Sequence, residues 1–291
     1  MSIPEVAIIA NPHSGAYDPS ILKSLAEGLS EFDPSVSVTE MPGHAAELSR
    51  SLPSGSWIVS LGGDGTINEI VNGISGTDKI LVPFPGGTGS DLVKTTGILT
   101  VQSAASAIRE GRYEKMDSVR VTLDGRSVYF ANILEIGFGA SVMQRVNSME
   151  KRGKRAFSSS VMRELPRLKS YRLDFESDGF TGNVDTVETV VANARYFGGG
   201  MLASPDSLPD DGLMDVHIVR KISRFRLFLS FGKMKSGKYV SMKEVRNFSA
   251  RKLIITGDPS PVEADGEYLG ESPVTIEVVP GSLRIVRDRS S

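Results

Sequence analysis

The sequence predicts two domains of different fold class: an N-terminal α/β domain with a parallel sheet, followed by a mostly antiparallel all-β domain. Length is the first observation, because 291 residues with 40% hydrophobic content can fill two cores. The second is a change near Met116, from alternating strands, glycine turns and helices to short alternating runs. We place the domains at residues 1–115 and 116–291, and leave open a return of the last strand to the first domain.

The first domain is predicted to be Rossmann-like, because its apolar runs each lead into a glycine-rich turn. The runs and turns are VAIIA (6–10) with NPHSG, WIVSL (57–61) with GGDGT, and ILVPF (80–84) with PGGTG. Such alternation favours parallel strands joined by crossover helices. The helix after GGDGT has an apolar face with the spacing i, i+3, i+4 and i+7, formed by Ile67, Ile70, Val71 and Ile74. Thr66 and Glu69 predict a capping box at its start, where the glycines end.

The second domain is predicted to be a β-sandwich, because its alternating runs are separated by turn signals. Asp-Gly pairs at Asp124, Asp178 and Asp265 predict hairpins. Two basic segments, residues 141–169 and 223–241, have a helical pattern. Since no long linker separates the domains, we expect an active-site cleft between them.

Composition excludes several classes of function. The 33 basic and 35 acidic residues nearly cancel, so the chain lacks the global field of a nucleic-acid-binding protein. The absence of cysteine excludes disulfides and thiolate chemistry and predicts a cytoplasmic protein. The first residues have no basic region of a signal peptide, and no run reaches the roughly 18 apolar residues of a membrane span. The three histidines show no metalloprotease or nucleophile-elbow spacing.

The glycine turns are candidate phosphate-binding sites. Glycine lets several backbone amides face one ligand, and the helix that follows adds its positive end. The candidate glycines are Gly62, Gly63, Gly65, Gly86, Gly87 and Gly89. The alternative is that these glycines only reverse the chain. Neither a Walker A sequence nor GxGxxG occurs at these helices.

Asp64 places a carboxylate inside one of these turns. A carboxylate there would repel a phosphate unless a cation or a proton intervenes, so Asp64 is a candidate Mg²⁺ or nucleotide-orienting group. The alternative is a turn aspartate bonded to its own backbone. The same reasoning covers Asp91, for which the alternative is that Ser90 or Asp91 is a helix N-cap.

The motifs NPHSG, GGDGTINEIVNG and PFPGGTGSDLVK, in this order, resemble the nucleotide-binding signatures of the diacylglycerol kinase catalytic-domain family. These are bacterial lipid kinases related to sphingosine kinases. Downstream, VVANARYFGGGMLASPDSLPDDGLMDVHIV and VEADGE resemble that family's β-domain segments, so the resemblance extends from about residue 6 to about residue 286. GGDGT alone is shared with NAD kinases and phosphofructokinases.

The resemblance implies that ATP phosphates lie against the GGDGT turn. The matching nucleotide-contact positions are Asn11, Ser14, Thr39, Gly62, Gly63, Asp64, Gly65, Thr66, Asn68, Glu69, Gly87 and Thr88. Asp64 is also expected to act in catalysis. Ser90 is a departure, because the family usually has an asparagine there, and serine has a shorter reach.

The resemblance also implies a catalytic base and a metal loop in the β domain. VEADGEYLG matches the segment that brings a carboxylate to the acceptor hydroxyl, with Glu267 preferred as base and Asp265 next. Spacing alone favours a plain hairpin turn there. In LPDDGL, the side chain of Asp211 and the backbone oxygens of Leu208 and Leu213 are expected to hold Mg²⁺; the alternative is an acidic type I turn.

The function expected from these motifs is an ATP-dependent, Mg²⁺-requiring lipid kinase that phosphorylates a membrane alcohol such as diacylglycerol. The alternatives are a soluble-substrate kinase resembling NAD kinase, and a nucleotide-binding regulatory module without catalysis. A lipid substrate implies transient docking at the inner membrane face. The stretch EKRGKRAF offers Lys151, Arg152, Lys154 and Arg155 beside Phe157, or else is a solvated basic face. A homodimer is left open.

Overall fold

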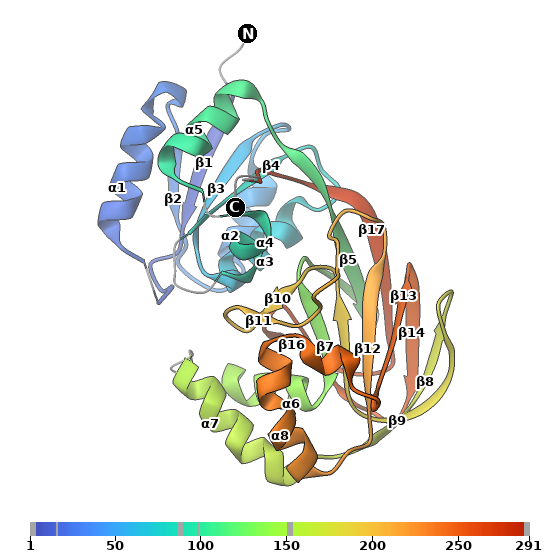
Figure 1. The fold of residues 1–291 in the computed structure, drawn as a ribbon. Coiled ribbons are helices and arrows are strands. Elements are labelled where there is room, and N and C mark those ends of the chain that lie inside the picture. Colours follow the sequence, from blue (N-terminus) through green and yellow to red (C-terminus); the bar gives the residue numbers. More distant parts are fainter. Residues whose placement is uncertain (1–3, 16, 86–89, 98, 150–153, 288–291) are drawn as a thin grey trace. The chain divides into compact units, whose positions relative to one another are not determined.

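The computed structural model describes residues 4–15, 17–85, 90–97, 99–149 and 154–287 (Figure 1). The chain divides into two compact units, one of residues 1–118 with 279–291 and the other of residues 119–278. Two strands belong to both units: β5 (Glu114–Leu123) begins in the first and ends in the second, and β17 (Val274–Ile285) begins in the second and ends in the first.

The first unit is a parallel sheet with strand order β4-β3-β1-β2. Its strands are β1 (Val6–Ala10), β2 (Ser35–Val38), β3 (Trp57–Gly62) and β4 (Ile80–Pro85). The end of β17 extends this sheet, since Arg284 pairs with Ile80 of β4 in parallel. Every residue of β1 and β3 is buried, as expected for a sheet covered on both faces. The predicted parallel α/β fold is therefore confirmed for this part of the chain.

The helices of the first unit pack in pairs, α1 against α5 and α2 against α3. Their bounds are α1 (Pro19–Gly28), α2 (His44–Ser51), α3 (Asp64–Ile74), α4 (Asp91–Thr96) and α5 (Val101–Glu110), and a 3₁₀ turn follows α1 at Ser30–Phe32. The predicted apolar face of α3 is confirmed. Its four members, Ile67, Ile70, Val71 and Ile74, are all buried.

The predicted capping box of α3 is wrong. The helix begins at Asp64, inside the glycine run, so Thr66 already lies in the first turn and cannot be its N-cap. The N-cap is Gly63, whose position has no side-chain capping bond. Glu69 instead accepts hydrogen bonds from the amides of Gly43 and Ala45, at 2.9 and 3.0 Å, and so caps the start of α2.

The second unit is built from antiparallel strands, with the order β16-β15-β7-β9-β8-β14-β17 and with β12 pairing β9 and β13. Its further strands are β6 (Arg126–Phe130), β7 (Ile133–Gly137), β8 (Tyr171–Ser177), β9 (Thr181–Ala192), β10 (Tyr196–Phe197), β11 (Met201–Leu202), β12 (Met214–Arg220), β13 (Val245–Ala250), β14 (Lys252–Gly257), β15 (Pro261–Ala264) and β16 (Glu267–Glu271). The predicted mostly antiparallel β domain is confirmed.

All three Asp-Gly signals are hairpins. Asp124 and Asp265 each begin a two-residue turn with positive φ, 50° and 46°, and the glycine that follows each also has positive φ. Two positive φ values define the turn that matches strand twist. Asp178 lies between the paired strands β8 and β9.

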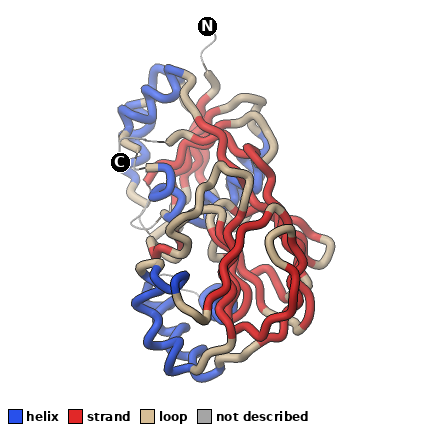
Figure 2. The backbone as a smooth tube through the Cα atoms, turned by 45° about the vertical axis from the view of Figure 1, so that its right-hand side comes forward, coloured by secondary structure: helices blue, strands red, loops and turns tan. Residues whose placement is uncertain are grey.

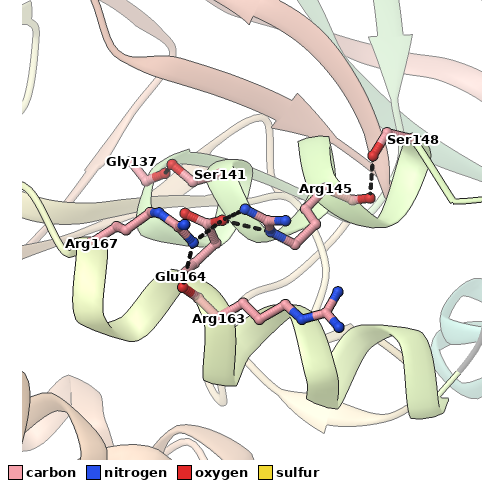
Figure 3. A network of polar contacts seen from close by, with 7 residues as sticks. All are labelled: Gly137, Ser141, Arg145, Ser148, Arg163, Glu164 and Arg167. Carbon is pink, nitrogen blue, oxygen red and sulfur yellow. Dashed lines mark hydrogen bonds and ion pairs between the residues drawn. The ribbon is translucent and has the colours of Figure 1, made fainter.

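Three helices of the second unit lie together on one side of its strands (Figure 2). They are α6 (Phe138–Asn147), α7 (Lys154–Glu164) and α8 (Arg224–Lys235), with 3₁₀ turns at Leu165–Arg167 and Lys238–Ser241. Glu164 of α7 accepts a hydrogen bond of 2.6 Å from Arg145 of α6 and also faces Arg167 (Figure 3). Helices form in both predicted segments: α7 and most of α6 lie within residues 141–169, and α8 lies within residues 223–241, while residues 150–153 lie outside the described residues. In the part of the chain that the structure describes, no helix is long and apolar enough to cross a bilayer.

Candidate active site

The first unit brings several predicted nucleotide-contact residues to the carboxyl edge of its parallel sheet. Asn11 follows β1, and its side-chain amide donates a hydrogen bond of 2.9 Å to the hydroxyl of Thr66 in α3. Thr39 follows β2, and its backbone amide donates to the carbonyl of Ala10 at 2.9 Å. Ligands of parallel α/β sheets bind at this edge. The fold thus brings these three residues to one edge of the sheet, and their contacts with a nucleotide stay a prediction.

The glycines of the GGDGT turn have two different functions in the fold. A Cβ on Gly62 would lie 2.4 Å from the Thr66 hydroxyl, so this glycine permits close packing within the protein. A Cβ on Gly63 or Gly65 would meet no described atom within 4 Å. These two positions leave open space beside the first amides of α3. Because no described side chain caps this helix, its N-terminal amides fit an anionic group such as a phosphate.

The loop after β1 adds a buried hydroxyl without a partner. The Oγ atom of Ser14 is shielded from solvent and has no hydrogen-bond partner among the described residues. The backbone of this loop is held by Asn11, whose carbonyl accepts from the Ser14 amide at 3.2 Å. A buried hydroxyl normally has a partner, so Ser14 fits a site that a ligand completes.

Asp64 connects the starts of two helices of the first unit, α3 and α4. Its Oδ1 atom accepts a hydrogen bond of 2.6 Å from the amide of Asp91, the first residue of α4. Ser90 is the N-cap of that helix, since its hydroxyl accepts from the amide of Val93, and the alternative weighed for Ser90 is thereby confirmed. Asn68 is half-buried on α3. Gly86, Gly87, Thr88 and Gly89 lie outside the described residues.

The expected metal loop is an exposed turn before β12. The Oδ1 atom of Asp211 accepts from the amide of Leu213 at 3.0 Å, around Gly212 with φ 75°. Within the described residues there is no group of three acidic or histidine side chains that could hold a metal. The expected site has only one side-chain donor, a carboxylate, together with the backbone oxygens of Leu208 and Leu213, so it would not appear as a group of three side chains. Oxygen donors of this kind fit the preference of Mg²⁺. The Mg²⁺ site stays a prediction.

A chain of hydrogen-bonded polar side chains, of which Ser204, Ser207 and His217 are buried, connects residues on either side of this loop. Ser207 donates to Asp215 at 2.6 Å, and Ser204 and His217 Nε2 are 2.7 Å apart, while His217 Nδ1 is 2.8 Å from Asn247 Oδ1. Ser204, His217 and Asn247 have the connectivity of a nucleophilic triad. Ser204 is only 1% exposed, however, and burial lowers the pKa of His217. This arrangement therefore stabilises the fold, and its serine is too buried to attack a substrate.

Asp265 and Glu267 occupy different positions around one hairpin. The Asp265 carboxylate accepts from three consecutive amides, of Ala131, Asn132 and Ile133, at 2.9 to 3.1 Å. Glu267 begins β16 opposite Ala264 and is half-buried. Spacing alone favoured a hairpin turn here, and the structure has one. The two acids are therefore unequal candidates, since Asp265 is committed to backbone groups and Glu267 lies on the return strand.

Three buried glutamates on neighbouring strands were missed by sequence reasoning. Glu135 of β7, Glu188 of β9 and Glu263 of β15 are each at most 4% exposed. Glu135 and Glu263 are opposite each other across the strands and share a hydrogen bond. Glu263 accepts from the amide of Gly266 at 2.8 Å, in the hairpin turn that follows. The available signal was a single acid inside an apolar strand, as in ILEIG and TVETVV.

Burial determines the protonation of this cluster. It raises the pKa of Glu135 to about 7, and it raises the pKa of Glu188 and Glu263 well above the usual value. The negative charge of Glu135 raises the pKa of the other two further. The cluster therefore holds protons under conditions in which exposed glutamates are ionised.

Comparison with known proteins places both parts of the chain. Residues 5–121 match the diacylglycerol kinase catalytic domain, and residues 132–287 match the YegS C-terminal NAD kinase beta sandwich-like domain. A diacylglycerol kinase of Mycobacterium tuberculosis is 30% identical over 237 residues, which are 80% of this chain and 77% of that protein. The crystal structure of a diacylglycerol kinase from Bacillus anthracis, 21% identical, matches with a TM-score of 0.72 over 100% of this chain and 99% of the other. The predicted fold class, an α/β domain followed by a β-sandwich domain, is confirmed.

Proposed function

We propose that this chain, which belongs to the diacylglycerol kinase catalytic-domain family of lipid kinases, transfers the γ-phosphate of ATP to a hydroxyl of a membrane lipid such as diacylglycerol. The observation that carries the proposal is the uncapped start of α3, where Gly63 and Gly65 leave open space beside backbone amides. Such a helix start binds phosphate through its amides and its dipole. Ser14, whose buried hydroxyl has no partner among the described residues, supports the same ligand.

ATP supplies the phosphoryl group, and the protein supplies positioning and charge. Backbone amides at residues 63–66 hold the phosphates, and Asp64 fixes the adjoining loop through the amide of Asp91. The lipid oxygen forms a bond to the γ-phosphorus as the bond to the β-phosphate oxygen breaks, and ADP leaves. Asp211, with the backbone oxygens of Leu208 and Leu213, would hold Mg²⁺, which neutralises phosphate charge when bound.

We propose that Glu267 is the general base that accepts the proton of the lipid hydroxyl. The Asp265 carboxylate accepts three amide hydrogen bonds, so its role is to position the hairpin. Glu267 lies two residues further along the same hairpin. General-base assistance of this kind is worth roughly 10² to 10⁴ in rate.

The test is incubation of the purified protein with labelled ATP, Mg²⁺ and a total lipid extract, followed by chromatography. We expect one labelled phospholipid, formed at a rate proportional to enzyme. Absence of any labelled lipid across the extract would contradict the proposal. A parallel reaction with NAD tests the soluble-substrate alternative, and a labelled dinucleotide as the only product would replace the proposed function. Binding of ATP with no transfer to either acceptor would identify a regulatory module.

The basic stretch that the sequence offered for membrane docking is only partly described. Lys151 and Arg152 lie outside the described residues, while Arg155 is exposed and Phe157 is half-buried on α7. Docking of the protein at the inner membrane face stays a proposal. Sedimentation with anionic vesicles at low and high salt tests it, because salt screens electrostatic attachment.

A further inference from the structure

Helix α8 has two apolar faces, only one of which packs on the protein. Its inner face contributes Leu227 and Met234 to the apolar cluster that it shares with α6 and α7, and Ser230 is buried between them in sequence. Its outer face has three apolar side chains, Phe225, Phe228 and Leu229, with exposed fractions of 71%, 49% and 62%. We call these three residues the α8 ridge.

The α8 ridge is unusual for a protein surface. Single exposed apolar residues are common, but two phenylalanines and a leucine at i, i+3 and i+4 form one continuous stripe. The inner face already satisfies the core, because Leu227 is only 2% exposed. The core therefore does not need the side chains of the ridge, and their apolar character is explained by contact with an external partner.

Cationic side chains surround the ridge. A groove of about 450 Å³ beside the first turn of α8 is lined by Lys169, Lys221 and Arg224 together with Phe225 of the ridge itself. Lys233 and Lys235 lie in the last turn, and α8 contains no acidic residue. A helix that combines apolar and basic side chains on its outer side is typical of binding at the surface of an anionic bilayer.

We propose that the α8 ridge inserts into the surface of an anionic membrane, while Lys169, Lys221 and Arg224 contact the lipid headgroups. This inference rests on the proposed function, because a lipid kinase must reach its substrate in a bilayer. A second copy of the chain is the other possible occupant, but a two-fold contact would bring the same cations together. Charge complementarity therefore favours the anionic lipid surface.

Insertion can be measured without altering the ridge. The chain has no cysteine, and a Cβ at Gly232, one turn beyond the ridge, would meet no described atom within 4 Å. Gly232→Cys therefore provides a single site for an environment-sensitive fluorophore. We expect a blue shift with phosphatidylglycerol vesicles and no shift for the same label at Met41→Cys, an exposed position in the first unit. Equal shifts, or none, at both positions would overturn the proposal.

Two sets of substitutions separate the apolar and the cationic contributions in vesicle sedimentation without ATP. Phe225→Ser/Phe228→Ser/Leu229→Ser should weaken binding at least about tenfold at low and high salt. Lys169→Gln/Lys221→Gln should weaken it roughly 25-fold, about fivefold for each cation, and only at low salt. The matched controls are Val36→Ser/Met41→Ser and Lys23→Gln/Lys252→Gln, which remove exposed side chains away from α8 and should leave binding unchanged.

The outcomes distinguish this inference from the proposed function. Unchanged vesicle binding by the triple variant would overturn the role of the ridge. If that variant also changed from dimer to monomer, a second copy of the chain would be the occupant of the ridge. Equal losses in the controls would overturn the location. Phosphorylation of a short-chain diacylglycerol dissolved as monomers tests catalysis separately, and the triple variant should retain it. If the wild-type protein binds vesicles through the ridge but phosphorylates no lipid, the proposed function fails and the docking surface stands.

Discussion

The two candidate regions use aspartate in glycine turns in opposite ways. In the first unit, Asp64 holds the amide of Asp91, and a Cβ at Gly63 or Gly65 would meet no described atom within 4 Å. In the second unit, Asp265 begins an Asp-Gly turn and accepts from three amides, so backbone donors are consumed by the protein. In the proposed reaction, the first region therefore binds the phosphates through N–H groups, and the second region holds its turn through Asp265 and takes the proton at Glu267. An anion fits the first region, and a hydroxyl that must lose a proton fits the second.

The largest effect is expected from Asp64→Ala. The substitution removes the acceptor for the Asp91 amide together with the proposed cation partner, so turnover should fall by more than the roughly 10² to 10⁴ of a lost general base. Steady-state kinetics and ATP titration measure both losses. Asp78→Ala is the matched control, because Asp78 also accepts an amide bond in this unit, from Gly55 at 3.1 Å. Equal losses in both variants would show that Asp64 has only a structural role.

Glu267→Gln should lower turnover by roughly 10² to 10⁴ and leave ATP affinity unchanged. The amide keeps the shape of the side chain but accepts no proton. Glu271→Gln, an exposed position at the end of the same strand, should retain full turnover. Normal turnover by the Glu267 variant would remove the assignment of the base.

Glu135 makes stability depend on pH. Its pKa is raised from 4.5 to about 7, so the folded state keeps a proton that the unfolded chain releases. The contribution of Glu135 to the free energy of unfolding should therefore be greatest below pH 4.5 and fall by about 3 kcal/mol as pH rises to about 7. Urea unfolding at several pH values measures this fall. Glu135→Gln should flatten it, and the exposed control Glu176→Gln should not. An equal slope in Glu135→Gln would contradict the buried proton.

Asp265→Ala should lower the free energy of unfolding by about 2 kcal/mol, because three amides lose their acceptor. Asp124→Ala is the matched control, since Asp124 is exposed at the same position of a similar turn and shares the positive φ. The difference between the free energies of unfolding of the two variants, measured in urea, gives the contribution of the three hydrogen bonds. Equal destabilisation would mean that the turn conformation alone explains the effect.

Local sequence patterns predicted the parts of the fold that depend on neighbouring residues. The strands before NPHSG and GGDGT, the buried face of α3 and the hairpins at Asp124 and Asp265 follow from short-range periodicity and turn chemistry. Contacts between distant residues were not predictable in this way. Glu69 caps a helix that starts 25 residues earlier, although its spacing from Thr66 favoured a local cap.

The candidate site shows the same limit. The family resemblance named Asn11, Thr39 and Thr66 as nucleotide-contact positions, but nothing in the sequence indicated that Asp265 holds amides more than 130 residues away. The buried glutamates were missed because an acid in an apolar strand reads as an exposed position of the alternating pattern. Only the pairing of β7 with β9 and β15 brings the three carboxyl groups together.

The most direct test of the phosphate-binding turn is the response of its backbone amides to ATP. In an NMR titration of the ¹⁵N-labelled protein with ATP and Mg²⁺, we expect the largest amide shifts at Gly63, Asp64 and Gly65, with Ser14 among the other affected residues. Saturable shifts confined to other segments, with these amides unchanged, would contradict the account.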